Sequence, residues 1–137
     1  MTSNNKRATI ENILEQLFSE HNLDIIEGAF SPNYVAYAAN KEYKGHNFLK
    51  KFTKQLCKSI PNIRVINVEF LLEDSKRITW QRTLTGIHKE NMQGIPASNK
   101  KITWNELVVS QFLDGKISKE WVVSELMGQL LLKQCKR

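Results

Sequence analysis

The sequence has few of the features that mark a membrane, secreted or metal-binding protein. It contains no apolar run near the ~18–20 residues that a membrane-spanning helix needs, and the N-terminal stretch MTSNNKRATIENI lacks the apolar segment of a signal peptide. Its two cysteines, Cys57 and Cys135, lie far apart and in no metal-ligand spacing, so we expect neither a disulfide nor a zinc site. These absences predict a cytoplasmic protein without a membrane partner or a bound metal.

The chain carries a net charge of +6, which raises the question of a nucleic-acid partner. Its lysines are densest over residues 44–58, where apolar side chains recur at helical spacing: Phe48, Leu49, Phe52, Leu56 and Ile60. An amphipathic helix with solvated lysines explains this pattern, and no recognised nucleic-acid motif accompanies it. We therefore expect no nucleic-acid partner, and keep a nucleic-acid or protein-interaction module as the weakest alternative.

One folded domain accounts for the length and the composition. The 137 residues are 41% hydrophobic and 25% charged, as in folded soluble proteins. We assign residues 1–137 to a single domain, with about residues 1–7 as a flexible N-terminal tail.

The order of helical and strand-like patterns predicts the fold class. Helical periodicity favours a first helix over roughly residues 8–20, a short second helix in HNLDIIEGAF, and the lysine-rich helix ending at Pro61. NYVAYAA reads as a short strand between them. Four long strands follow in IRVINVEFLLED, KRITWQRTLTG, KKITWNELVVSQFL and KISKEWVVSEL, and MGQLLLKQ closes as a short helix. Early helices and late strands predict an α+β fold, a curved sheet with helices packed on one face.

Alternation along the strands predicts which side chains share a face. Trp80, Arg82 and Leu84 fall on one side of KRITWQRTLTG, together with Ile78, and threonines and Gln81 fall on the other. A buried Arg82 needs a partner, and Glu106 or Glu125 on neighbouring strands would serve. The dipeptide Asp114-Gly115 is the strongest short hairpin signal and should join the last two strands.

Several motifs in their order and spacing resemble a known family. They are Gly86-Ile87-His88, Gly94-Ile95-Pro96-Ala97-Ser98-Asn99-Lys100, Phe112-Leu113-Asp114-Gly115-Lys116-Ile117 and Trp121. Together they look like the SnoaL-like polyketide cyclase family, and the likeness covers about residues 24–133. The resemblance implies the nuclear transport factor 2-like fold, a cone-shaped curved mixed β-sheet wrapped by N-terminal helices around one deep pocket. It also implies a homodimer.

Asn99 stands where this family commonly has Gly. A Gly there suits a turn that needs a positive φ, and Asn is the best other residue for it. The stretch around it therefore reads as a long hairpin connection at the pocket rim, with Met92 and Ile95 as a flexible apolar lip.

The resemblance implies candidate catalytic groups. The family's acid/base is an Asp four residues after the Trp of the last strand, and here that position holds Glu125. Trp121, Val123 and Glu125 share one side of a strand, so all three should face the pocket together. The alternative is a strand-end Glu125 that reaches solvent. Tyr37 and Gln111 occupy positions where the family commonly has His and Arg or His, which weakens the case for its cyclisation chemistry.

The remaining candidates for ligand contact are large or polar side chains on the predicted pocket walls. They are Phe52, Trp80, Arg82, His88, Met92, Trp104, Trp121 and Val123, with Tyr37 and Gln111. Core packing is the simpler role for each tryptophan and for Met92, and a structural role is the simpler one for His88.

Two functions fit these patterns. The first is a cofactor-independent cyclase or isomerase that transfers a proton next to a carbonyl of a hydrophobic, polycyclic or β-keto small molecule. The second is a non-catalytic small-molecule-binding domain with the same pocket. Fold alone does not choose between them.

Overall fold

The structure is a computed structural model, and it describes residues 5–134. Helices α1 to α4 and strands β1 to β6 make up the described chain, with a π-helical turn (Glu15–Ser19) after α1. In chain order they are α1 (Asn5–Leu14), α2 (Ile25–Ala29), β1 (Phe30–Ala38), β2 (Lys41–Lys44), α3 (Gly45–Ser59), β3 (Arg64–Glu73), β4 (Arg77–Ile87), β5 (Lys101–Leu113), β6 (Lys116–Ser124) and α4 (Leu126–Leu132).

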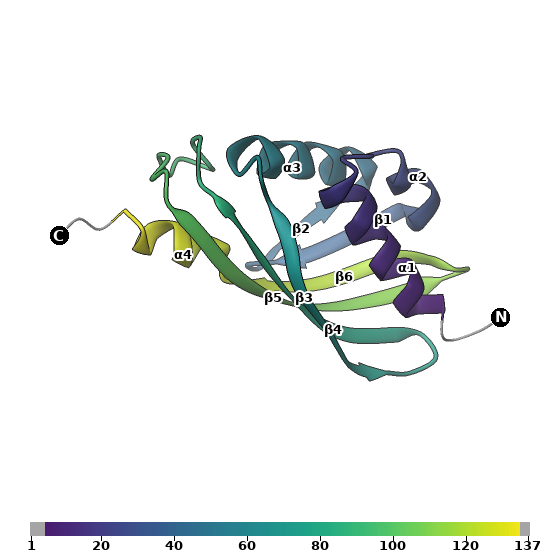
Figure 1. Cartoon of the computed structure of the whole chain (residues 1–137). Helices are drawn as coiled ribbons and strands as arrows, with labels where there is room; N and C mark the ends of the chain where they lie inside the picture. The colour runs from purple at the N-terminus through teal and green to yellow at the C-terminus, as the bar shows by residue number, and fades with distance from the viewer. Residues whose placement is uncertain (1–4, 135–137) are drawn as a thin grey trace.

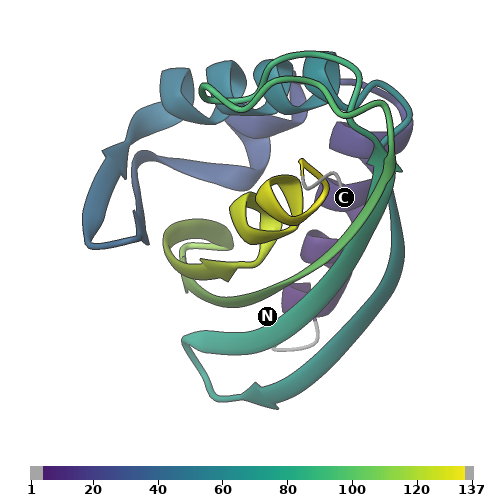
Figure 2. The same cartoon turned by 90° about the vertical axis from the view of Figure 1, so that its left-hand side faces the viewer.

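The six strands form one mixed sheet in the order β2-β1-β6-β5-β4-β3. Strands β1 and β6 run parallel, and the other neighbours are antiparallel. Helices α1, α2 and α3 cover one face of the sheet (Figure 1). The sheet curls around the space beneath them, and α4 lies across one end of that space (Figure 2). The predicted α+β cone is confirmed.

The inner face of the sheet carries the side chains that alternation predicted. On β4, Ile78, Trp80 and Leu84 are buried, and Arg82 shares their side. Across β5, Trp104 and Val108 continue the same layer. Helix α3 adds its apolar stripe from above and leaves most of its lysines in water, because hydrophobic residues recur on one side of it.

Two turns adopt the backbone geometry that their residues predicted. Asn99 has φ 60° and so occupies the left-handed region expected there. Asp114 and Gly115 have φ 54° and 79°, and two successive positive values match the tight hairpin between β5 and β6.

Some element boundaries differ from the prediction. Helix α1 already begins at Asn5, so residues 5–7 are helical rather than part of a tail, and residues 1–4 lie outside the described part of the chain. Lys6 explains the early start, because it is buried and pairs with Glu73 at 3.5 Å. Strand β2 was not predicted, and the pairing of its four residues with β1 creates it. Cys135, which we expected not to pair with Cys57, also lies outside the described residues.

The outer face of the sheet is partly apolar. Leu107 and Val123 face each other in the β5–β6 register and are 41% and 70% exposed. Beside them, the ring of Trp121 stacks on Tyr37, with centroids 5.5 Å apart. None of the helices within residues 5–134 is long and apolar enough to cross a membrane.

Candidate functional site

A cavity of about 540 Å³ lies between the inner face of the sheet and the covering helices. This volume falls in the range of small-molecule sites, roughly 300–1,000 Å³. Most of its wall is apolar, and α1, the π-helical turn and α3 contribute to it with Leu14, Phe18, Phe48 and Phe52 among the lining side chains. Such a wall removes an apolar ligand from water and leaves recognition to the few polar groups inside.

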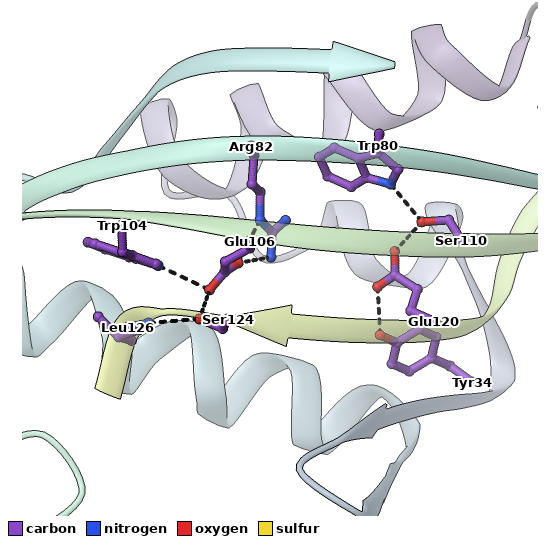
Figure 3. Close-up of polar contacts among 9 residues, drawn as sticks. All are labelled: Tyr34, Trp80, Arg82, Trp104, Glu106, Ser110, Glu120, Ser124 and Leu126. Carbon is purple, nitrogen blue, oxygen red and sulfur yellow. Dashed lines mark hydrogen bonds and ion pairs between the residues drawn. The ribbon is translucent and has the colours of Figure 1, made fainter. Parts of the chain in front are cut away.

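The polar groups that the sheet brings to the cavity belong to two clusters (Figure 3). The Glu106 cluster consists of Arg82, Trp104, Glu106 and Ser124. The Glu120 cluster consists of Tyr34, Trp80, Ser110 and Glu120. Each is built from residues that strand pairing places side by side, so the sheet fixes their mutual positions.

In the Glu106 cluster, both carboxylate oxygens are fully used. Oε1 accepts a hydrogen bond from Arg82 Nε at 2.7 Å and forms an ion pair with Arg82 Nη2 at 2.6 Å, and Oε2 accepts hydrogen bonds from Trp104 Nε1 at 3.0 Å and Ser124 Oγ at 2.7 Å. Burial alone would raise the pKa of Glu106. The Arg82 charge and the hydrogen bonds outweigh burial and hold that pKa below its usual value. Glu106 is therefore a stable anion that holds Arg82.

In the Glu120 cluster, the carboxyl group has weaker partners. Tyr34 donates its hydroxyl to Oε1 at 2.7 Å, and Ser110, which receives the indole N–H of Trp80, donates to Oε2 at 2.5 Å. Burial raises the pKa of Glu120 above its usual value, and hydrogen bonds from Ser110 and Tyr34 oppose this without cancelling it. Burial, followed by the charge of Glu120, also raises the pKa of Tyr34, so its hydroxyl stays protonated.

The two carboxyl groups of one cavity thus have pKa values shifted in opposite directions. Two carboxyl groups with oppositely shifted pKa values are suited to different roles: the lowered one to a permanent negative charge, and the raised one to proton transfer. Glu120 suits the second role, because a raised pKa brings its protonated and ionised forms closer in free energy near neutral pH.

The structure places only some of the predicted ligand contacts at the cavity. Phe52, Trp80, Arg82 and Met92 line it, and Val123 is also among the lining residues although its side chain is 70% exposed on the outer face. Trp104 is buried behind Glu106 and contacts its carboxylate. Of the two possible partners for Arg82, the structure selects Glu106.

His88 is fully buried, and neither ring nitrogen has a hydrogen-bond partner among residues 5–134. Burial lowers its pKa, so the ring is neutral. Met92 follows in the same loop and is also fully buried, so it belongs to the cavity wall rather than to a flexible lip.

Three other predicted residues lie away from the cavity. Tyr37 and Trp121 stack on each other outside it, and Gln111 lies on the same outer side of the sheet, opposite Arg77 and Lys119. The departures from the family pattern at Tyr37 and Gln111 therefore do not alter the cavity.

Glu125 is also displaced from its expected position. It is exposed at the end of β6, and its Oε1 accepts the backbone N–H of Asn105 at 3.1 Å. The cause is a register shift between Gln111 and Phe112 in the β5–β6 pairing, which adds one residue to β6 and reverses its facing. Ile117 faces inward before the shift, and Glu120 and Val122 face inward after it.

Sequence reasoning therefore missed Glu106 as a cavity group, except as a partner of Arg82, and missed Glu120 entirely. The sequence could have indicated that Glu106 faces the cavity, because Glu106 lies two residues from Trp104 on the apolar side of β5. Glu120 had no such signal, because simple alternation from Ile117 points it outward.

Comparison with known proteins gives the family and the fold. A family model described as SnoaL-like polyketide cyclase matches residues 8–134. No curated protein matches the sequence at a significant level.

Three solved structures illustrate the likeness in fold. A proposed SnoaL-like polyketide cyclase from Jannaschia sp. CCS1 superposes with TM-score 0.87 at 15% identity, over 98% of this chain and 95% of that one. AclR, a proposed hydroxylase from Streptomyces galilaeus, gives 0.83 at 19% identity, over 97% and 98%. A SnoaL-like polyketide cyclase from Agrobacterium tumefaciens gives 0.75 at 18% identity, over 98% of each chain. At these identities the likeness establishes the fold and not the activity.

Proposed function

Because the chain belongs to the SnoaL-like polyketide cyclase family, we propose that its cavity binds an apolar, carbonyl-bearing small molecule and moves a proton on it. The observation that carries this proposal is Glu120, a carboxyl group with a raised pKa in a mostly apolar cavity. The reaction class is cyclisation or isomerisation without a cofactor.

The chemical step needs one group that takes a proton and returns it. As a carboxylate, Glu120 accepts the proton of a C–H bond next to the ligand carbonyl, and the electron pair of that bond forms the enolate. The enolate carbon then attacks a second carbonyl of the same molecule, and Glu120 gives its proton to the new alkoxide. Where a C=C bond of the ligand is conjugated with the enolate, return of the proton to the far carbon of that conjugated system gives isomerisation instead. In both cases the atoms balance and Glu120 is regenerated.

The neighbours of Glu120 support this role. Tyr34 and Ser110 hold both of its oxygens, which fixes the carboxyl group without the full positive charge that would make it a weak base. Glu106 is less suited, because three hydrogen bonds and the Arg82 charge already stabilise its anion.

The second candidate function is binding without chemistry. It is favoured by the same contacts, since the two oxygens of Glu120 already have hydrogen-bond partners within the protein. A ligand would then meet mainly the apolar wall and be held by burial alone.

Exchange of α-protons tests the proposal without knowledge of the natural ligand. 2-Tetralone, a bicyclic ketone, would be incubated in D2O with the protein, and loss of its α-proton signals followed by NMR. We expect the wild type to accelerate exchange over buffer, and Glu120→Gln to remove the acceleration by about 100-fold or more. Glu125→Gln is the matched control, an exposed glutamate five residues away that should exchange at the wild-type rate.

Each other outcome has a defined meaning. Full exchange in Glu120→Gln would refute the role of Glu120. Loss of exchange in Glu125→Gln alone would return the role to the residue that the family pattern indicates. Binding of 2-tetralone without any accelerated exchange would favour the non-catalytic function.

A further inference from the structure

Arg82 presents part of its guanidinium group to the cavity. Glu106 Oε1 occupies Nε and Nη2, which form one edge of the planar group. The Arg82 side chain is 21% exposed and lines the cavity, and no hydrogen bond joins Nη1 to any of residues 5–134. The edge formed by Nη1 and the second N–H of Nη2 is therefore open to a ligand, with two parallel donors.

The guanidinium group is held in place from two sides. Its carbon lies 5.2 Å from the centre of the Trp80 ring, in a cation–π contact. On the other side, Glu106 is itself fixed by Trp104 and Ser124. Arg82 thus does not need to be ordered when a ligand arrives, which reduces the entropic cost of binding.

Two parallel N–H donors match the two oxygens of a carboxylate. Arginine–carboxylate pairs of this kind are among the stronger polar contacts in proteins, and they favour planar acceptors. The Arg82 charge offsets that of Glu106, so a ligand carboxylate at this cluster meets no net negative charge.

We infer that Arg82 is a recognition residue for a ligand carboxylate, and that the substrate class is a fused-ring or extended keto acid with a free carboxyl group. This inference rests on the proposed function of the same cavity. It adds the orientation of the ligand, with the carboxylate at Arg82 and the reacting carbon at Glu120.

The spacing of the two clusters sets the length of such a ligand. Glu106 and Ser110 belong to different clusters and are four residues apart on β5, which corresponds to roughly 13 Å along the strand. Trp80 lies between the clusters, because its indole N–H belongs to one of them and its ring lies under the Arg82 guanidinium of the other. A ligand that reaches both clusters therefore needs about three fused rings or an equivalent chain.

The test compares a carboxylic acid with its own methyl ester. Anthraquinone-2-carboxylate and its methyl ester have the same planar tricyclic body, and neither has a C–H bond next to a carbonyl that Glu120 could ionise. Calorimetric titration at pH 7.5 therefore measures recognition and not catalysis. We expect the wild type to bind the carboxylate about tenfold or more tightly than the ester, because bonds to charged groups contribute about 1.5–3 kcal/mol and 1.4 kcal/mol is tenfold.

A paired set of variants assigns the preference to Arg82. The double variant Arg82→Met/Glu106→Gln removes both charges but keeps an oxygen for Trp104 and Ser124, and it should bind acid and ester equally. The matched control is Asp74→Asn/Arg77→Met, which removes an exposed ion pair at the start of the same strand and should keep the preference.

The outcomes separate this inference from the proposed function. Equal binding of acid and ester by the wild type would overturn the role of Arg82 and leave the cavity function standing, and this comparison needs no variant to fold. A preference that survives in Arg82→Met/Glu106→Gln would also overturn it. Failure of both probes to bind the wild type would contradict both the inference and the proposed function.

Discussion

Replacing Glu106 with leucine should destabilise the protein by about 3–5 kcal/mol, the range for breaking a buried ion pair from one side. The substitution strands the Arg82 charge, whose side chain is only 21% exposed. It also removes the acceptor of the indole N–H of Trp104, a residue that is only 1% exposed. An unpaired buried donor costs about 1–3 kcal/mol, which is part of that total. The partial exposure of Arg82 to the cavity favours the lower half of the range. For a chain of this length, the expected fall in melting temperature is roughly 10–15 °C.

Urea unfolding followed by circular dichroism would measure the loss, with Arg82→Met added to complete a double-mutant cycle. The second change removes the stranded charge, so the double variant should recover about half of the lost free energy and keep the cost at Trp104. Glu90→Leu is the control, because Glu90 pairs with Lys58 at 4.0 Å on the surface and should matter by about 0.5 kcal/mol or less. A loss below about 1 kcal/mol for Glu106→Leu, or no recovery with Arg82→Met, would refute the reasoning.

Three further predictions follow from other parts of the structure. Gly86→Ala should cost about 1–3 kcal/mol, because a Cβ there would lie 2.3 Å from Ile60 Cγ2, whereas Gly128→Ala in α4 meets no atom within 4 Å and should be neutral or stabilising in the same melts. The melting temperature of Glu120→Gln should rise relative to that of the wild type by a margin that grows as the pH increases above about 4.5. The native carboxyl group has a raised pKa, so above that pH the wild type binds more protons folded than unfolded and loses stability as the pH rises. A constant margin would contradict the raised pKa. We also propose that the outer sheet face pairs with a second copy, so sedimentation at tens of micromolar should show a wild-type dimer that Leu107→Lys weakens, and a wild-type monomer would dismiss it.

Local chemistry in the sequence determined the architecture. The helical stripes, the late run of alternating strands and the Asp114-Gly115 turn each depend on neighbours a few residues away, so they can be read without a structure. The positive φ of Asn99 could likewise be predicted from its immediate neighbours in the sequence. The sequence also limited the partner of Arg82 to two glutamates, because a buried charge on one strand needs an opposite charge on a neighbouring strand.

The tertiary structure decided which carboxyl group faces the cavity. The period of a strand is two residues, so one extra residue in β6 exchanges the inner and outer faces of all that follows. That single shift turned Glu120 inward and left Glu125 in water. The pairing of β6 with β5 and β1 sets the position of the shift, and no short stretch of sequence encodes it. The opposite pKa shifts of Glu106 and Glu120 have the same origin, because they depend on burial and on partners that only the assembled sheet brings together.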